Sequence, residues 1–212
     1  PGVTEPNPAR IPEIISLKMV PDPTGSLDQV IGLSEQINDE TIRVDVPEGK
    51  YVFYALVKFR SFASVISGAP GAAGPILNHL DAAAVRKYLD HMSDAIQKKT
   101  GLLSDHVRAL FTDSMELEGC NWGDDFAAEF QKRRGYDIMP CLPFIMFKVG
   151  RRGGVVDENY GAVKTADFKE VIRRVRFDFE LTKAELLKER FTGTYLQWCR
   201  DLGVKSRAQA YG

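Results

Sequence analysis

The sequence lacks several features that mark specialised classes of protein. Its 212 residues carry 28 lysines and arginines against 29 aspartates and glutamates, so the net charge is only −1. Such a balance gives no electrostatic footprint for nucleic acid or for an anionic membrane surface. No apolar run reaches the roughly 18 residues that a membrane span requires. We therefore expect neither nucleic acid nor a membrane as a partner, and favour a neutral molecule.

Cysteine is also scarce. The chain has three, Cys120, Cys141 and Cys199, which are too few and too scattered for a disulfide framework. We expect them to be reduced and partly buried. No signal peptide is visible, but the chain begins at Pro1 without a methionine and stops directly after a strand-like stretch. We expect that both ends are cut, in which case the missing signal says nothing about location.

The first sixty residues predict an entry segment followed by a small antiparallel β unit. Residues 14–20 are strand-like, and a turn rich in proline and glycine follows them. Residues 41–46 alternate, residues 47–50 form a turn, and residues 51–59 continue as another strand. We place a first domain at 1–60 and a second at 61–212.

From residue 51 the predicted order is strand, helix, strand, helix, long helix, strand. Asp81 suits the cap of a helix in which apolar residues recur at helical spacing, namely Val85, Tyr88, Leu89, Met92 and Ile96. A second helix at 124–134 ends at Gly135. The long pattern at 166–202 shifts phase and contains Gly193, which predicts two helices or one bent helix. This alternation favours parallel βα units of an α/β fold, in an open sheet or in part of a barrel.

An acidic segment follows the strand-like run 107–111, whose apolar content predicts burial on both faces. The polar and aromatic side chains in question are Asp113, Glu116, Glu118, Asn121 and Trp122. The carboxyl end of a parallel strand is where α/β barrels carry catalytic residues. Carboxylates there can hydrolyse a glycoside, bind a hard cation, or cap the next helix. The residues alone leave these roles open.

Two further features bear on a sugar site. Trp122 beside Asn121 suits the binding of a sugar, because a sugar stacks its C–H face on an aromatic ring and directs its hydroxyls to polar groups. Trp122 can equally anchor the loop in the core. In extended geometry Glu116 and Glu118 share a face while Asp113 and Glu116 do not, so at most two of these acids point into one site. His79 stands just before a helix start and is predicted to face a substrate; a surface or helix-end position is the alternative.

Three stretches together resemble the catalytic region of glycoside hydrolase family 106, the α-L-rhamnosidases and their relatives. They are VDVPEGKYVFYALV at 44–57, LFTDSMELEGCNWGDDFAAEFQKRRGYD at 110–137, and VKSRAQAYG at 204–212. The resemblance implies large, exported bacterial enzymes with a (β/α)8 barrel and accessory β-domains, which invert the configuration at the cleaved carbon and hold calcium. It therefore implies a partial (β/α)8, TIM-like barrel segment behind the N-terminal β unit, and a secreted or periplasmic location.

The resemblance also implies roles for residues that match the family's motif. Glu116 becomes the candidate catalytic carboxylate or metal ligand, and Asp113, Asn121 and Trp122 become candidates for binding the sugar. Outside the matched positions, we name Glu118 as a candidate ligand of the calcium that the resemblance implies, and His79 as a further candidate for binding the sugar. The implied substrate is a terminal deoxy-sugar of a plant-type glycan, although Met115 and Glu118 depart from the family pattern and leave rhamnose specificity open. A glycosidase needs two carboxylates, and in a barrel they come from different strands. We expect the second beyond residue 212 and no activity from this chain alone; a non-catalytic carbohydrate-binding or structural barrel segment is the alternative.

Overall fold

The computed structural model describes residues 12–37, 41–59, 74–113, 121–146, 148–149, 155–156 and 159–209. The chain forms two compact units, one from Pro1–Phe62 with Asp125–Glu180, the other from Ala63–Asp124 with Leu181–Gly212. The N-terminal β unit thus shares a unit with residues 125–180, and the domain division expected at residue 60 stays a prediction. Among the described residues, no helix is long and apolar enough to span a membrane.

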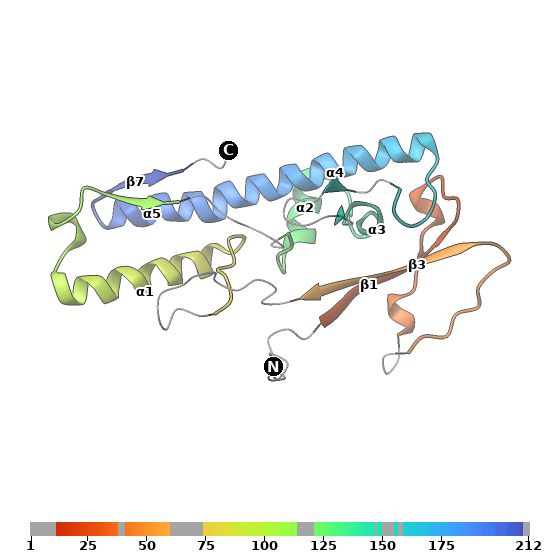
Figure 1. Ribbon diagram of the computed structural model, residues 1–212, viewed down its shortest axis with the longest axis horizontal. Helices are drawn as coiled ribbons and strands as arrows, with labels where there is room; N and C mark the ends of the chain where they lie inside the picture. The colour runs from red at the N-terminus through yellow and green to blue at the C-terminus, as the bar shows by residue number, and fades with distance from the viewer. Residues whose placement is uncertain are drawn as a thin grey trace. The chain divides into compact units, whose positions relative to one another are not determined.

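The first unit contains a three-stranded antiparallel sheet, in agreement with the predicted β unit. The strand order is β2-β1-β3, with β1 at Pro12–Pro21, β2 at Ile31–Gly32 and β3 at Tyr51–Phe59 (Figure 1). Two short 3-10 helices, η2 (Leu27–Gln29) and η3 (Ser34–Gln36), flank β2.

The pairing of β3 corrects the predicted hairpin. Residues 42–47 form no regular strand, and β3 pairs instead with β1, from Pro12 opposite Phe59 to Pro21 opposite Tyr51. Burial explains the choice, because Met19 and Val20 of β1 are 2% and 0% exposed whereas Val46 keeps 51% of its surface in solvent.

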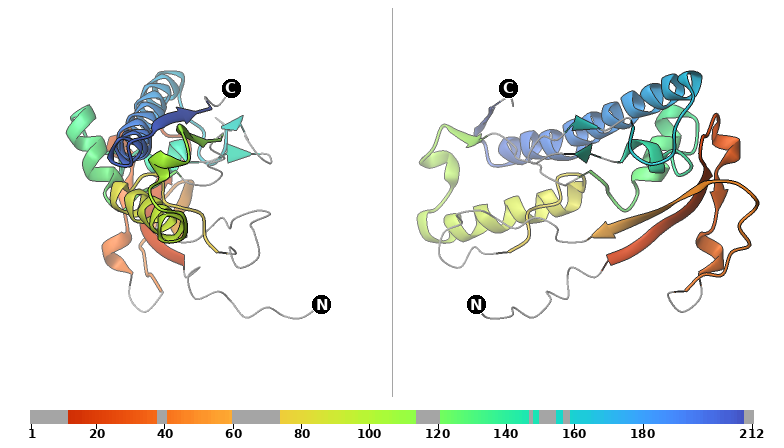
Figure 2. Two further views of the ribbon diagram at one scale, coloured as in Figure 1. Left: turned by 90° about the vertical axis from the view of Figure 1, so that its left-hand side faces the viewer. Right: turned by 45° about the vertical axis from the view of Figure 1, so that its right-hand side comes forward.

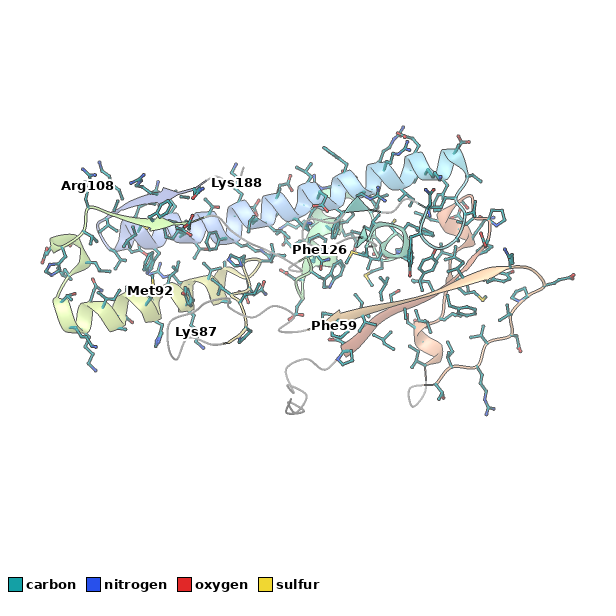
Figure 3. All side chains as sticks on the ribbon, viewed as in Figure 1. Phe59, Lys87, Met92, Arg108, Phe126 and Lys188 are labelled. Atoms are coloured by element: carbon teal, nitrogen blue, oxygen red, sulfur yellow. The ribbon has the colours of Figure 1, made fainter. Side chains whose placement is uncertain are left out.

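Aromatic residues fill the helical part of this unit. Helix α2 (Phe126–Arg134) ends at Gly135, whose positive φ of 83° forms the predicted left-handed stop. Phe126 is fully buried, and its ring centroid lies 5.2 Å from that of Phe179 in α4 (Ala166–Leu187) (Figure 3).

The segment between α2 and α4 contains short elements. The one-turn helix α3 (Leu142–Ile145) lies in the proline-interrupted stretch, and β5 (Lys148–Val149) pairs with β6 (Val155–Val156). Cys141 is free and buried, and burial raises its pKa to about 12.

A loop before α4 is pinned to the sheet. The hydroxyl of Tyr54 accepts a 2.7 Å hydrogen bond from the backbone N–H of Ala162, and Thr24 exchanges backbone hydrogen bonds with Val163 and Thr165. Gly161 adopts a φ of +77°, and a Cβ there would lie 2.7 Å from Cζ of Tyr54. The loop therefore depends on glycine for both its backbone conformation and its close packing.

The second unit packs helices against a parallel strand pair. It contains α1 (Ala82–Thr100), η4 (Leu103–Asp105), β4 (Ala109–Thr112), α5 (Gly193–Asp201) and β7 (Lys205–Ala208). A π-helical turn, η5 (Lys188–Thr192), joins α4 to α5 directly before Gly193, which confirms the predicted phase shift. The buried cluster comprises Val85, Leu89, Phe191, Tyr195, Trp198, Cys199 and Val204.

Helix α1 confirms one prediction and corrects another. Asp81 caps it by accepting hydrogen bonds from the N–H groups of Ala83 and Ala84 at 2.9 and 3.1 Å. The apolar stripe, however, is buried only in part. Val85 and Leu89 face the cluster, while three members of the predicted stripe are 55%, 37% and 41% exposed: Tyr88, Met92 and Ile96. The packed face runs through Ser93 instead, because α5 lies along that side.

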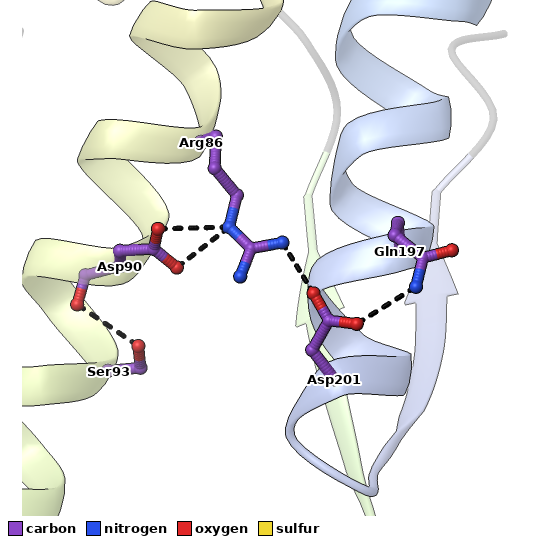
Figure 4. Close-up of polar contacts among 5 residues, drawn as sticks. All are labelled: Arg86, Asp90, Ser93, Gln197 and Asp201. Atoms are coloured by element: carbon purple, nitrogen blue, oxygen red, sulfur yellow. Dashed lines mark hydrogen bonds and ion pairs between the residues drawn. The ribbon is translucent and has the colours of Figure 1, made fainter.

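A charged network joins α1 to α5 (Figure 4). Nε of Arg86 donates to both carboxylate oxygens of Asp90 at 2.8 and 2.9 Å, and its Nη1 donates to Asp201. Gln197 donates to the other oxygen of Asp201 at 2.9 Å. The hydrogen bond from Arg86, with help from Gln197, lowers the pKa of Asp201 below its ordinary value.

We expect this network to make stability depend on pH. The pKa of Asp201 in the folded chain lies below the unfolded value of about 3.9. The hydrogen bonds to the Asp201 carboxylate therefore stabilise the folded chain fully above that pH, and this contribution disappears as acid protonates the folded carboxylate. The difference in thermal midpoint between the parent chain and Asp201→Asn should therefore be present at pH 6 and shrink below about pH 4. Asp94→Asn, an exposed carboxylate of α1, is the matched control. A difference that does not change with pH would contradict this role.

Candidate active site

The parallel pair β4–β7 forms the edge at which the predicted site begins. Ala109, Leu110, Phe111 and Thr112 pair in order with Lys205 through Ala208, and the N–H of Gln209 donates to the carbonyl of Thr112 at 3.1 Å. Both strands therefore end together, pointing the same way beside α5 (Figures 1 and 2). This confirms the parallel arrangement that the alternating elements predicted, and Asp113 and Gln209 are the residues that directly follow the last pair at the carboxyl edge.

Only one face of this pair is covered in the described residues. Leu110 and Val204 pack into the helical cluster, whereas Phe111, which points to the opposite face, is 56% exposed. The prediction of a strand buried on both faces is therefore wrong for β4. A strand needs layers on both sides to be doubly buried, and here α1 and α5 supply one layer.

The acidic segment is described only at its two ends. Asp113 is exposed directly after β4, and Asn121 and Trp122 are half-buried beyond the segment. Residues 114–120, with the candidate carboxylates Glu116 and Glu118, lie outside the described residues. Within the described part of the chain, no three acidic, histidine or cysteine side chains gather to hold a metal ion. The catalytic and metal-binding roles therefore stay predictions.

His79 belongs to the segment that leads into α1. It comes three residues before α1, whose N-terminal end lies on the side to which the arrows of β4 and β7 point (Figure 1). Its ring packs 4.9 Å from that of Phe191, and burial lowers its pKa, against a smaller effect of the Leu77 backbone. Burial thus favours the neutral form of the imidazole. Its Nδ1 is buried and has no hydrogen-bond partner among the described residues, and substrate contact stays a prediction.

Sequence reasoning missed Arg207. Its guanidinium lies over the ring of Phe111, 5.8 Å from the centroid, on the face of the strand pair away from the helices. Alternation along the strand could have indicated this position. Arg207 comes three residues after Val204, so the two side chains face opposite ways, and Val204 belongs to the core. The pairing register of β4 and β7, which only the structure shows, places Arg207 beside Phe111.

Comparison with known proteins assigns the family. The model of the α-L-rhamnosidase family, glycoside hydrolase family 106, matches residues 13–212. The chain belongs to this family. The family resemblance that its three motifs indicated is thereby confirmed.

Two proteins illustrate the relationship. The solved structure of a rhamnosidase from Novosphingobium sp. PP1Y is similar to this chain, with a TM-score of 0.65 and 26% identity, covering 87% of this chain and 17% of that protein. A protein of Formosa agariphila named "Putative beta-glucuronidase" is 25% identical over 185 residues, covering 86% of this chain and 14% of the relative. The family 106 chain described here thus spans less than a fifth of either protein.

Proposed function

We propose that this chain is part of the catalytic region of a family 106 glycoside hydrolase that removes a terminal deoxy-sugar from a plant-type glycan. The observation that carries the proposal is the family match over residues 13–212, together with Asp113 at the carboxyl edge of the parallel strand pair. The acidic segment begins at that edge, where barrel enzymes carry their catalytic groups. In this proposal β4 and β7 are two neighbouring strands of a (β/α)8 barrel, and the sheet pair is one part of its wall.

The proposed chemistry uses one carboxylate from this chain. Glu116 acts as general acid or general base, and Asp113, Asn121, Trp122 and His79 bind the sugar. Inversion requires two carboxyl groups roughly 6.5–9.5 Å apart, so that a water molecule fits between one of them and the sugar. We propose that the second carboxylate comes from another strand of the longer protein.

The proposed function predicts that the isolated chain does not turn over an aryl α-L-rhamnoside, whereas the complete protein does. The reason is that, in this proposal, the second carboxylate comes from another part of the longer protein, and each carboxylate contributes a large factor to the rate. Release of the aryl group, followed by absorbance with equal molar amounts of both proteins, measures this. Robust turnover by the isolated chain would overturn the proposed division of the site. A complete protein that binds the sugar without cleaving it would favour the carbohydrate-binding alternative.

We propose further that Glu118 contributes to a calcium site near the sugar. Calcium takes six to eight oxygen ligands, so several must come from groups beyond Glu118. Treating the complete protein with a chelator should then lower its thermal midpoint, and added calcium should restore it. Glu118→Gln should weaken calcium binding in calorimetry, and an unchanged calcium affinity would remove Glu118 from the site.

Family membership also supports a secreted or periplasmic location, which fractionation of the native cells can check.

A further inference from the structure

The helix that runs from α4 into α5 changes its hydrogen-bonding pattern at η5. The N–H of Gly193 donates to the carbonyl of Lys188, five residues earlier, whereas an α-helix bonds residues four apart. The spacing of the buried side chains agrees with this pattern. Leu186 and Phe191, on either side of the turn, are five residues apart, whereas Phe191 and Tyr195 are four apart. The turn therefore contains one residue more than an α-helical turn would.

The extra residue decides which side chain of the turn enters the buried cluster. In an uninterrupted α-helix, with about 3.6 residues per turn, Arg190 would follow Leu186 on the buried face, and a charged group would point into the cluster. Phe191 takes this place instead and is 7% exposed, while Arg190 is only half-buried. The π-helical turn thus allows both an aromatic ring and a guanidinium to reach the segment before α1.

Both side chains hold that segment at neighbouring residues. The ring of Phe191 packs against the ring of His79, with 4.9 Å between their centroids, and Nη1 of Arg190 donates to the backbone carbonyl of Leu80 at 2.9 Å. Within the segment, the side-chain oxygen of Asn78 accepts a hydrogen bond from the N–H of Leu80 at 3.1 Å. The orientation of the His79 imidazole therefore depends on η5.

The imidazole of His79 is suited to bind a neutral polar group. Its Nδ1 is buried and has no hydrogen-bond partner among the described residues, so Nε2 is the nitrogen through which the ring can bind a ligand. Burial lowers the pKa of His79 and favours the neutral ring, whose Nε2 can donate to a hydroxyl group or accept from one. The segment leads into the N-terminal end of α1, on the side to which the arrows of β4 and β7 point (Figure 1). Loops on that side of a parallel sheet carry substrate-binding groups.

We propose that η5 is the positioning element of the sugar site, in which Arg190 and Phe191 hold His79 so that its Nε2 binds a hydroxyl group of the sugar. This inference rests on the proposed function and deepens it, because it assigns the residues behind a substrate-binding side chain. A neutral imidazole that binds a hydroxyl group agrees with a neutral deoxy-sugar. π-Helical turns are rare and frequently lie at functional sites, which supports a role beyond packing.

The test is a double-mutant cycle in the complete protein. We would measure kcat and KM for an aryl α-L-rhamnoside, and the dissociation constant of L-rhamnose by calorimetry, for the parent, His79→Ala, Arg190→Met and the double variant. Arg190→Lys keeps a donor for the carbonyl of Leu80, and Phe191→Leu keeps an apolar side chain in the cluster. Arg200→Met, which removes an exposed arginine of α5, is the matched control. The thermal midpoint of each variant shows that it is folded.

The inference expects His79→Ala to raise both KM and the dissociation constant of L-rhamnose by about 3- to 10-fold, the effect of one hydrogen bond to a neutral group, with kcat within about twofold of the parent. Arg190→Met and Phe191→Leu should change the same quantities in the same direction. The double variant should lose no more affinity than His79→Ala, because both substitutions remove one interaction. Arg190→Lys should keep more affinity than Arg190→Met, and Arg200→Met should match the parent.

The possible results separate this inference from the proposed function. Additive losses in the double variant, or an affinity that does not respond to Arg190→Met, would overturn the inference and leave the hydrolase function intact. The same holds if His79→Ala binds L-rhamnose as the parent does. A complete protein that binds L-rhamnose through the coupled pair but cleaves no rhamnoside would contradict the hydrolase function while supporting the positioning role. Absence of both binding and cleavage in the parent would contradict both proposals.

Discussion

Replacing Glu116 by glutamine in the complete protein should lower kcat by about 100- to 10,000-fold while leaving sugar binding nearly unchanged. Glutamine keeps the shape and the hydrogen-bonding reach of the side chain, but it cannot deliver or remove a proton. Steady-state kinetics with an aryl glycoside measures the rate, and calorimetry with the free sugar measures binding. Glu170→Gln is the matched control, because this carboxylate is half-exposed on α4 and pairs with Arg173.

The leaving group can show which role Glu116 has. If Glu116 is the general acid, the loss should be small for a dinitrophenyl glycoside, which needs no protonation to depart, and large for an alkyl glycoside. If it is the general base, the loss should be similar for both substrates, because activation of water is impaired in each case. A kcat equal to that of the parent with either substrate would remove Glu116 from the catalytic pair.

Replacing Gly161 by alanine should destabilise the first unit by about 2–5 kcal/mol. Two costs combine, because the residue has a φ of +77° and because the new methyl group would meet the ring of Tyr54, with Cζ at 2.7 Å and Cε1 at 2.9 Å. Tyr54 is 3% exposed and holds the N–H of Ala162, so its ring cannot move aside without leaving that group unpaired. Urea unfolding of the chain, followed by circular dichroism, measures the change.

Two other glycines separate these costs. Gly135→Ala should destabilise the chain by about 1–2 kcal/mol, through the left-handed backbone alone. The φ of Gly135 is +83°, and no atom lies within 4 Å of the added Cβ. Gly74→Ala has the same open space without the positive φ, and its effect should be small. In a Tyr54→Phe background, the cost of Gly161→Ala should fall because one of the clashing atoms is gone. If Gly161→Ala costs no more than Gly135→Ala, the packing against Tyr54 does not limit stability.

The sequence alone predicted the features that depend on near neighbours. A carboxylate two residues before a free N–H group caps a helix wherever the helix lies, and Asp81 does so. Gly135 ends α2 and the helix changes pitch before Gly193 for equally local reasons, namely backbone freedom and the phase of the apolar pattern. The ordered motifs identified the family, and the alternation of strands and helices predicted that β4 and β7 are parallel.

Only the tertiary structure decided which segments meet. Residues 41–46 and β1 both had the pattern of a partner for β3, and β1 was selected because it buries Met19 and Val20. The contact between Tyr54 and Ala162 joins residues 108 positions apart, and the stack of Arg207 on Phe111 depends on strand register. Periodicity in a sequence specifies which side of a helix or strand is apolar, but the partner that covers that side is chosen by the packing energy of the whole fold.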